Sequence, residues 1–108
     1  MGEISVSVVL AGYNEEQNIV STVEALRARC PELDLLVVND GSSDATGALC
    51  REHGYPLAEL PVNLGIGGSV QTGYRYALVH GYDAAVTLIS AALSCLVIWE
   101  LAASRFVP

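Results

Sequence analysis

A short apolar run that ends in a polar turn most constrains what this chain can fold into. Residues 35–38 read LLVV and lead directly into NDGSSDAT at residues 39–46. An uninterrupted apolar run of this length is typical of a parallel strand that is covered on both faces. The turn then falls at the carboxyl end of the strand, where open α/β sheets bind ligands. Asn, Asp, Gly and Ser also form tight turns and helix caps, so the motif alone leaves a purely structural interpretation open.

The first half of the chain alternates strand and helix patterns. A β-rich run at residues 4–10 is followed by Asn14, which is predicted to cap a helix that ends at Pro31. The apolar positions of this helix recur at intervals of three and four residues, as one buried face requires. A second strand at residues 33–39 then precedes a short helix, and Gly54 is placed to end it.

The second half repeats this alternation with a weaker strand. Residues 57–62 contain Glu59 and Pro61, which predicts a short strand at the edge of the sheet. A glycine-rich turn at residues 63–69 leads into a helix that begins near Val70 and closes at Gly81. A fourth strand is predicted from residue 84 to residue 88.

This order predicts an α/β fold of one small domain. The expected architecture is a Rossmann-like open parallel sheet of about four strands with flanking helices. In such a sheet the turns at Tyr13, Asp40 and Gly65 gather on one carboxyl edge. Together they indicate a binding site, which none of them indicates separately.

The candidate site offers acids, amides and an aromatic ring. Glu15 and Asp40 can accept hydrogen bonds from a base or a ribose, and Tyr13 can pack against a ring. Backbone amides at residues 65–69 can approach a phosphate closely because glycine has no side chain. The structural alternatives are a helix-dipole partner for Glu15 and a packing role for Tyr13.

Composition excludes several classes of function. The chain has no lysine and a net charge of −7, which rules out a P-loop and leaves little from which to build a nucleic-acid patch. The G-x-G-x-x-V pattern at residues 65–70 lacks the third glycine of a dinucleotide fingerprint and follows the third strand instead of the first. The three cysteines have no C-x-x-C spacing, which favours reduced thiols in the cytoplasm over disulfides or structural zinc.

The end of the chain differs in character from the rest. Residues 84–99 carry no charge, and hydrophobic residues make up 52% of the whole chain. This run is slightly shorter than a membrane-spanning helix needs. A strand followed by a buried helix is the expected structure, with a membrane segment as the alternative. Self-association or membrane association through this hydrophobic end is the corresponding expectation for partners.

Three motifs resemble those of a known enzyme family. AGYNEEQNI at residues 11–19, LLVVNDGSSDAT at 35–46 and LPVNLGIGGSVQTGYRYALVHGYDA at 60–84 resemble the amino-terminal half of a family 2 glycosyltransferase with the GT-A fold. The most similar branch contains the polyprenyl-phosphate mannosyl- and glucosyltransferases. The resemblance implies that residues 1–86 form the nucleotide-sugar-binding half of a GT-A domain and that residues 87–108 form a divergent hydrophobic tail.

The resemblance also implies a site and its ligands. The donor would be a UDP- or GDP-linked sugar, and the acceptor a polyprenyl phosphate or another molecule. No catalytic residue is assigned. The residues expected to bind the nucleotide-sugar are Ala11, Gly12, Tyr13, Glu15, Asp40, Gly41, Gly65 and Gly67.

Departures from the family pattern bear on activity. Ala11 replaces the usual proline, and Asn39 stands at the first of two acidic positions. The family uses a divalent metal, Mg²⁺ or Mn²⁺, held by an acidic motif after the fourth strand, but no carboxylate lies between Asp83 and Glu100 here. The resemblance implies that the acceptor half is missing as well. The sequence therefore predicts a donor-binding domain that is truncated and weakly active or inactive, with a non-catalytic nucleotide-binding or interaction module as the alternative.

Overall fold

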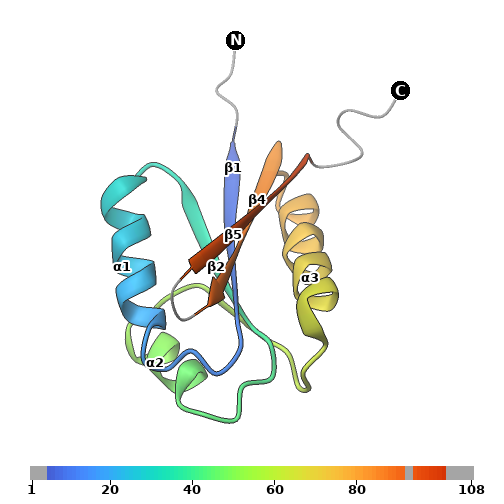
Figure 1. Cartoon of the computed structure of the whole chain (residues 1–108). Helices are drawn as coiled ribbons and strands as arrows, with labels where there is room; N and C mark the ends of the chain where they lie inside the picture. Colours follow the sequence, from blue (N-terminus) through green and yellow to red (C-terminus); the bar gives the residue numbers. More distant parts are fainter. Residues whose placement is uncertain (1–4, 92–93, 102–108) are drawn as a thin grey trace.

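The computed structural model describes residues 5–91 and 94–101 of the chain and contains one sheet in the order β3-β2-β1-β4-β5 (Figure 1). β1 to β4 pair in parallel, and β5 runs antiparallel to β4. The strands are β1 Val6–Gly12, β2 Asp34–Asn39, β3 Leu57–Glu59, β4 Ala84–Ala91 and β5 Ser94–Leu101. The helices are α1 Ile19–Arg29, α2 Thr46–Glu52 and α3 Gly65–Val79.

Helices cover both faces of the sheet, which explains why β2 carries an uninterrupted apolar run and why nearly all of β1 is buried. α1 and α2 lie on one face, where Ile19 and Cys50 pack with Leu10 of β1 and Val37 of β2. α3 lies on the other face, and Figure 1 shows it on the opposite side of the sheet from α1. Gly73 allows this helix to approach β1 closely, since a Cβ there would lie 2.5 Å from Cγ1 of Val9.

The predicted fold class is confirmed, including the weak third strand at an edge of the sheet. β3 pairs only with β2 among the strands of the sheet. α2 ends as predicted, because Gly54 follows it with a φ of 70°. The glycine after α3 also behaves as predicted, since Gly81 has a φ of 76°.

Two predicted helix starts are wrong. α1 begins at Ile19 and not at Asn14, which has a φ of 52° and does not cap the helix. The reason is tertiary: the side chain of Asn14 is bonded to the turn after β2. α3 begins at Gly65, so the glycine-rich segment forms the first turn of this helix and does not precede it.

The prediction of a helix near the end of the chain is also wrong. β4 continues to Ala91, and residues 94–101 form β5, which pairs back on β4 with Ala84 opposite Leu101. An apolar run of eight residues cannot be assigned to strand or helix by periodicity alone. In the described part of the chain, no helix is long and apolar enough to cross a membrane. Residues 102–108 of the predicted tail lie outside the described residues.

The buried side chain of Tyr55 should make the free energy of unfolding depend on pH in the alkaline range. The hydroxyl of Tyr55 donates a 2.6 Å hydrogen bond to Glu24, and the Arg27 guanidinium lies 4.8 Å from the ring centroid. Burial, followed by this bond to Glu24, raises the pKa of Tyr55 from 10 to about 12. The folded state therefore holds the phenol proton more tightly than the unfolded state.

We expect this contribution to stability to be complete below pH 10 and to be lost as the pH rises from 10 to about 12. The loss should reach about 2 kcal/mol, which urea unfolding at a series of pH values measures. In Tyr55→Phe this alkaline loss should be smaller. An unchanged alkaline slope in that variant would contradict the assignment.

Candidate functional site

The turns that follow β1 and β2 meet the start of α3 at the carboxyl edge of the sheet. The backbone N–H of Asp40 donates to the carbonyl of Gly12 at 2.9 Å, which continues the β1–β2 pairing into the turn. The predicted convergence of Tyr13, Asp40 and Gly65 at one edge is therefore observed, because hydrogen bonds join all three turns.

Asp40 connects the second turn to α3. Its side chain is 4% exposed, and its carboxylate accepts hydrogen bonds from the backbone N–H of Leu64 at 2.7 Å and of Gly65 at 2.9 Å. The side-chain amide of Asn63 donates to the same carboxylate at 3.2 Å. A carboxylate at this end of a helix also interacts favourably with the helix dipole. Asp40 therefore has a structural role, and contact with a nucleotide is an additional prediction.

Asn14 joins the first turn to the second. Its backbone N–H donates to Oγ of Ser42 at 2.9 Å, and its Oδ1 accepts from the backbone N–H of Ser43 at 2.9 Å. The φ of 52° at Asn14 turns the backbone so that both bonds form together. Asparagine tolerates this left-handed conformation better than most residues do.

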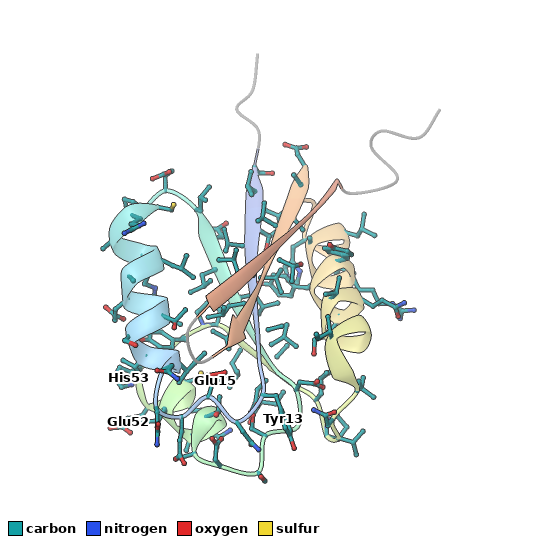
Figure 2. All side chains as sticks on the ribbon, in the orientation of Figure 1. Tyr13, Glu15, Glu52 and His53 are labelled. Atoms are coloured by element: carbon teal, nitrogen blue, oxygen red, sulfur yellow. The ribbon has the colours of Figure 1, made fainter. Side chains whose placement is uncertain are left out.

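The two predicted contact residues of the first turn differ in exposure. Tyr13 is 48% exposed, so its ring is available to a ligand. Glu15 is 8% exposed; its backbone N–H donates to Oγ1 of Thr46, and its carboxylate accepts from Asn18 at 3.3 Å. Figure 2 shows both residues on the loop that follows β1, at the end of the molecule where α2 lies.

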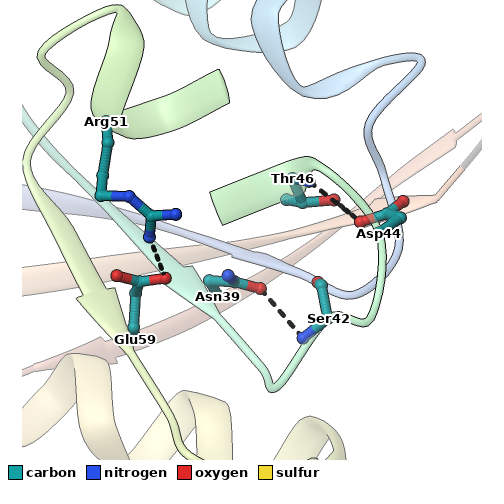
Figure 3. Close-up of polar contacts among 6 residues, drawn as sticks. All are labelled: Asn39, Ser42, Asp44, Thr46, Arg51 and Glu59. Carbon is teal, nitrogen blue, oxygen red and sulfur yellow. Dashed lines mark hydrogen bonds and ion pairs between the residues drawn. The ribbon is translucent and has the colours of Figure 1, made fainter. Parts of the chain in front are cut away.

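The second turn is stabilised from within (Figure 3). Oδ1 of Asn39 accepts from the backbone N–H of Ser42, and Asp44 accepts from both the hydroxyl and the backbone N–H of Thr46. Burial acts to raise the pKa of Asp44, but the hydrogen bonds from Thr46 and from the Glu16 backbone outweigh it, and the pKa is lowered. The turn therefore holds Asp44 in its charged form.

The remaining predicted site residues form the backbone of this edge. Ala11 and Gly12 end β1, and Ala11 is buried. Gly41 has a φ of 67° and Gly65 a φ of 79°, so both occupy the left-handed region that favours glycine. A Cβ at Gly67 would meet open space, which leaves the surface of the first turn of α3 accessible.

The acidic residues at this edge do not fit a divalent metal. Among residues 5–91 and 94–101, no group of three or more His, Cys, Asp or Glu side chains could hold one. The carboxylate of Asp40 is bonded to backbone amides, and Glu16 accepts from the backbone N–H of Ala45 at 3.4 Å. A metal needs carboxylate oxygens that are free to coordinate, and both oxygens of Asp40 already accept backbone hydrogen bonds.

Sequence reasoning missed the residues that hold the turns together. The sequence predicts a helix cap at Asn14 and indicates no role for Thr46 or Asn63. All three lie within the motifs at residues 11–19, 35–46 and 60–84, and this location is the signal that the sequence offers for their importance. Their partners are 23 to 31 residues away along the chain, and spacing alone does not identify such pairs.

The fold defines an α/β domain of the Rossmann-like class, with a candidate site at the carboxyl ends of its parallel strands. Residues 7–79 match the family model described as Glycosyl transferase family 2. This chain belongs to that family.

Two curated bacterial proteins are similar to this chain over most of its length. Polyprenol monophosphomannose synthase of Mycolicibacterium smegmatis is 31% identical over 87 residues, which cover 75% of this chain and 33% of that protein. Undecaprenyl-phosphate mannosyltransferase of Micrococcus luteus is 32% identical over 85 residues, covering 74% of this chain and 35% of that protein. This chain thus spans about one third of the length of these relatives.

Solved structures share the fold. Glucosyl-3-phosphoglycerate synthase of Mycobacterium tuberculosis, in complex with Mn²⁺, UDP and phosphoglyceric acid, is 26% identical with a TM-score of 0.64, covering 81% of this chain and 33% of that one. A mannosyltransferase of Pyrobaculum calidifontis, in complex with GDP-Man and Mn²⁺, has a TM-score of 0.67 at 21% identity, covering 78% of this chain and 26% of that one. At 21% identity, the similarity to the Pyrobaculum calidifontis structure supports the fold alone.

Proposed function

We propose that this domain recognises a nucleotide-diphospho-sugar, linked to UDP or GDP, as the donor half of a glycosyltransferase. The observation that carries the proposal is the network that joins both turns and the start of α3 at one sheet edge. Such an edge is where α/β sheets bind nucleotides. The solved relative that contains UDP supports the same ligand class.

The exposed groups at this edge fall into two sets, one suited to the donor nucleotide and one suited to a lipid-linked acceptor. The ring of Tyr13 is free to pack on a base, whereas the first turn of α3 has open space over Gly67. Apolar side chains are also exposed on the segment that enters α3, namely Val62, Leu64 and Ile66. These side chains suit a lipid-linked acceptor, and we propose polyprenyl phosphate, which the names of the two curated relatives also suggest.

The reaction of this class breaks the bond between the anomeric carbon and the diphosphate, so the leaving group departs with negative charge. The described residues supply donor contacts but no assigned base and no metal ligand set. Electrostatic help to the leaving group is usually a large part of such catalysis. We therefore propose that residues 1–86 bind the donor and that transfer by the chain alone is weak or absent.

Calorimetry with UDP and with GDP tests donor recognition, with Mn²⁺ added in a parallel series. Binding of either nucleotide supports the proposal, and its absence in both series contradicts it. Transfer of radiolabelled mannose from GDP-mannose to polyprenyl phosphate tests turnover separately. Rapid transfer would show that the estimate of weak activity is wrong while leaving donor recognition intact.

Replacement of the exposed ring should weaken nucleotide binding without affecting the fold. We expect Tyr13→Ala to lower the affinity for UDP or GDP about tenfold, since stacking on a base contributes about 1 to 3 kcal/mol. Val79→Ala is the matched control, because Val79 is also an exposed apolar side chain but ends α3 at its far end. Equal effects of the two substitutions would remove Tyr13 from the site.

The second candidate is a non-catalytic nucleotide-binding or interaction module. The observation that favours it is the internal use of the acidic side chains Asp40, Asp44 and Glu16. This candidate predicts nucleotide binding that Mn²⁺ leaves unchanged, together with no transfer. Binding that Mn²⁺ strengthens would favour the enzyme.

We also propose a cytoplasmic location, which the free thiols of Cys30 and Cys50 support. The uncharged run at residues 84–99 supports self-association or association with a membrane surface. Analytical ultracentrifugation and vesicle flotation distinguish the two.

A further inference from the structure

A cavity opens at the edge of the sheet opposite the candidate site, where the strands begin. It has a volume of about 560 Å³ and lies around the amino end of β2. Ser7 near the start of β1, Asp34 at the start of β2 and the rings of Tyr76 and Tyr82 line it, together with Arg27 from α1. Its volume is within the range of small-molecule sites. None of its lining residues belongs to the carboxyl edge described above.

A buried hydroxyl without a partner lines this cavity. Ser7 is 1% exposed, and its Oγ has no hydrogen-bond partner. Such a group costs about 1 to 3 kcal/mol when it is left unsatisfied, so buried hydroxyls are nearly always bonded. Oγ itself has less than 1 Å² of accessible surface, so the Ser7 side chain must rotate toward the cavity before a ligand hydroxyl can bond it and remove this cost.

The charges around the cavity select a neutral ligand with hydroxyl groups. Arg27 can only donate hydrogen bonds and the carboxylate of Asp34 can only accept them, and their charges cancel. The hydroxyl of Tyr82 donates to Oδ2 of Asp34 at 2.5 Å, which leaves Oδ1 for a ligand. A hydroxyl group can donate to the carboxylate, accept from the guanidinium and do either with Ser7.

Two aromatic rings provide the apolar part of the cavity. The rings of Tyr76 and Tyr82 have centroids 6.5 Å apart and planes inclined by 24°. Both side chains are partly exposed. One face of the Tyr76 ring is stacked on His80, with ring centroids 4.1 Å apart, so a ligand can contact this ring only at its remaining surface. The C–H face of a pyranose packs on such rings while its hydroxyls point to the polar side chains.

From this combination we infer that the amino edge binds a neutral monosaccharide unit at a site separate from the donor edge. Ser7 and Asp34 bond its hydroxyls, and the two tyrosines pack against its ring. The inference goes beyond donor recognition and does not depend on it.

An NMR titration of the ¹⁵N-labelled chain with methyl α-D-mannopyranoside and with D-glucose tests the site. We expect saturable amide shifts around residues 7, 34, 76 and 82 with a dissociation constant of about 1 to 10 mM, and no shifts around residues 12, 40 and 65. Glycerol, which has hydroxyls but no ring, should produce no saturable shift. Absence of saturation with both sugars, or equal shifts with glycerol, would overturn the inference.

Ser7→Ala removes only the unpartnered hydroxyl. We expect it to weaken sugar binding at least about fivefold while leaving stability unchanged or slightly raised. Thr87→Val is the matched control, because Thr87 is also fully buried with an unpartnered hydroxyl but does not line the cavity. Asp34→Asn, at an exposed position, is a second variant that should also weaken binding. Unchanged affinity in both cavity variants would overturn the inference.

The titration also separates this inference from the proposed function. Sugar-induced shifts confined to the carboxyl edge would overturn the second site while supporting the first. UDP and GDP carry no hexose and should shift only the carboxyl edge. Failure of nucleotide binding would leave the result at the amino edge unaffected.

Discussion

Replacement of Gly41 with alanine should destabilise the domain by about 3 to 5 kcal/mol, a large part of the stability of a chain of this size. Two effects combine. The φ of 67° strains any residue that carries a Cβ. The new Cβ would also lie 2.5 Å from the backbone N of Asn63 and 2.5 Å from the carbonyl carbon of Val62. Because both contacts are backbone atoms, rotation of a side chain cannot relieve them.

Gly54→Ala is the matched control for this substitution. Gly54 has a φ of 70°, but a Cβ there would meet nothing within 4 Å. It should therefore show the conformational cost alone, about 1 to 2 kcal/mol. Urea unfolding of both variants measures the difference. Equal losses would mean that the loop before α3 moves away from Gly41 and that the close approach is not required.

Replacement of Asp40 with alanine should cost about 3 to 4 kcal/mol. The substitution leaves the N–H groups of Leu64 and Gly65, whose bonds to Asp40 are partly buried, without their acceptor, and each unsatisfied donor carries a desolvation penalty. Asn63 loses one of its two bonds to Asp40 and keeps the one to the backbone carbonyl. Nucleotide affinity should fall with stability, so this variant does not by itself test contact with the ligand.

Asp40→Asn is a smaller change at the same carboxylate and tests the same stability contribution. One amide oxygen remains as an acceptor, but the NH₂ group faces an N–H donor, so we expect about half the loss of the alanine variant. Glu32→Gln, which removes a charge from an exposed side chain, serves as the control and should change stability by less than about 0.5 kcal/mol. A loss in Asp40→Ala no larger than in this control would show that the carboxylate does not hold α3.

The parallel sheet could be predicted from sequence because its evidence is local. Each of β1 and β2 is a short apolar run followed at once by a polar turn, and each is buried on both faces as such runs require. The ends of α2 and α3 could also be predicted. Gly54 and Gly81 each follow the C-cap residue of their helix and adopt the positive φ that ends a helix.

The start of α1 could not be predicted from local evidence. Asn14 has the right chemistry for a helix cap, but two residues of the second turn compete for it, namely Ser42 and Ser43. A tertiary interaction therefore overrides a local preference. β5 could not be predicted for a different reason: an apolar run without periodicity fits a strand or a helix equally well.

The convergence of the three turns could be predicted from the sequence, but the hydrogen bonds of the Asp40 carboxylate could not. The three motifs indicate which turns meet, because all of them follow parallel strands. They do not indicate that Asp40 is bonded to the start of α3, since this depends on the position of a loop more than twenty residues away.

The bonds between the turns give the carboxyl edge an unusual dependence on the whole domain. They connect residues separated by 24 to 31 positions, so no single βα unit can form this edge independently. Occupancy by a nucleotide and cooperative unfolding are then linked equilibria, and a ligand that binds there should raise the melting temperature. Conversely, a substitution that loosens α3 against the sheet, far from any ligand, should appear in a binding experiment as reduced affinity.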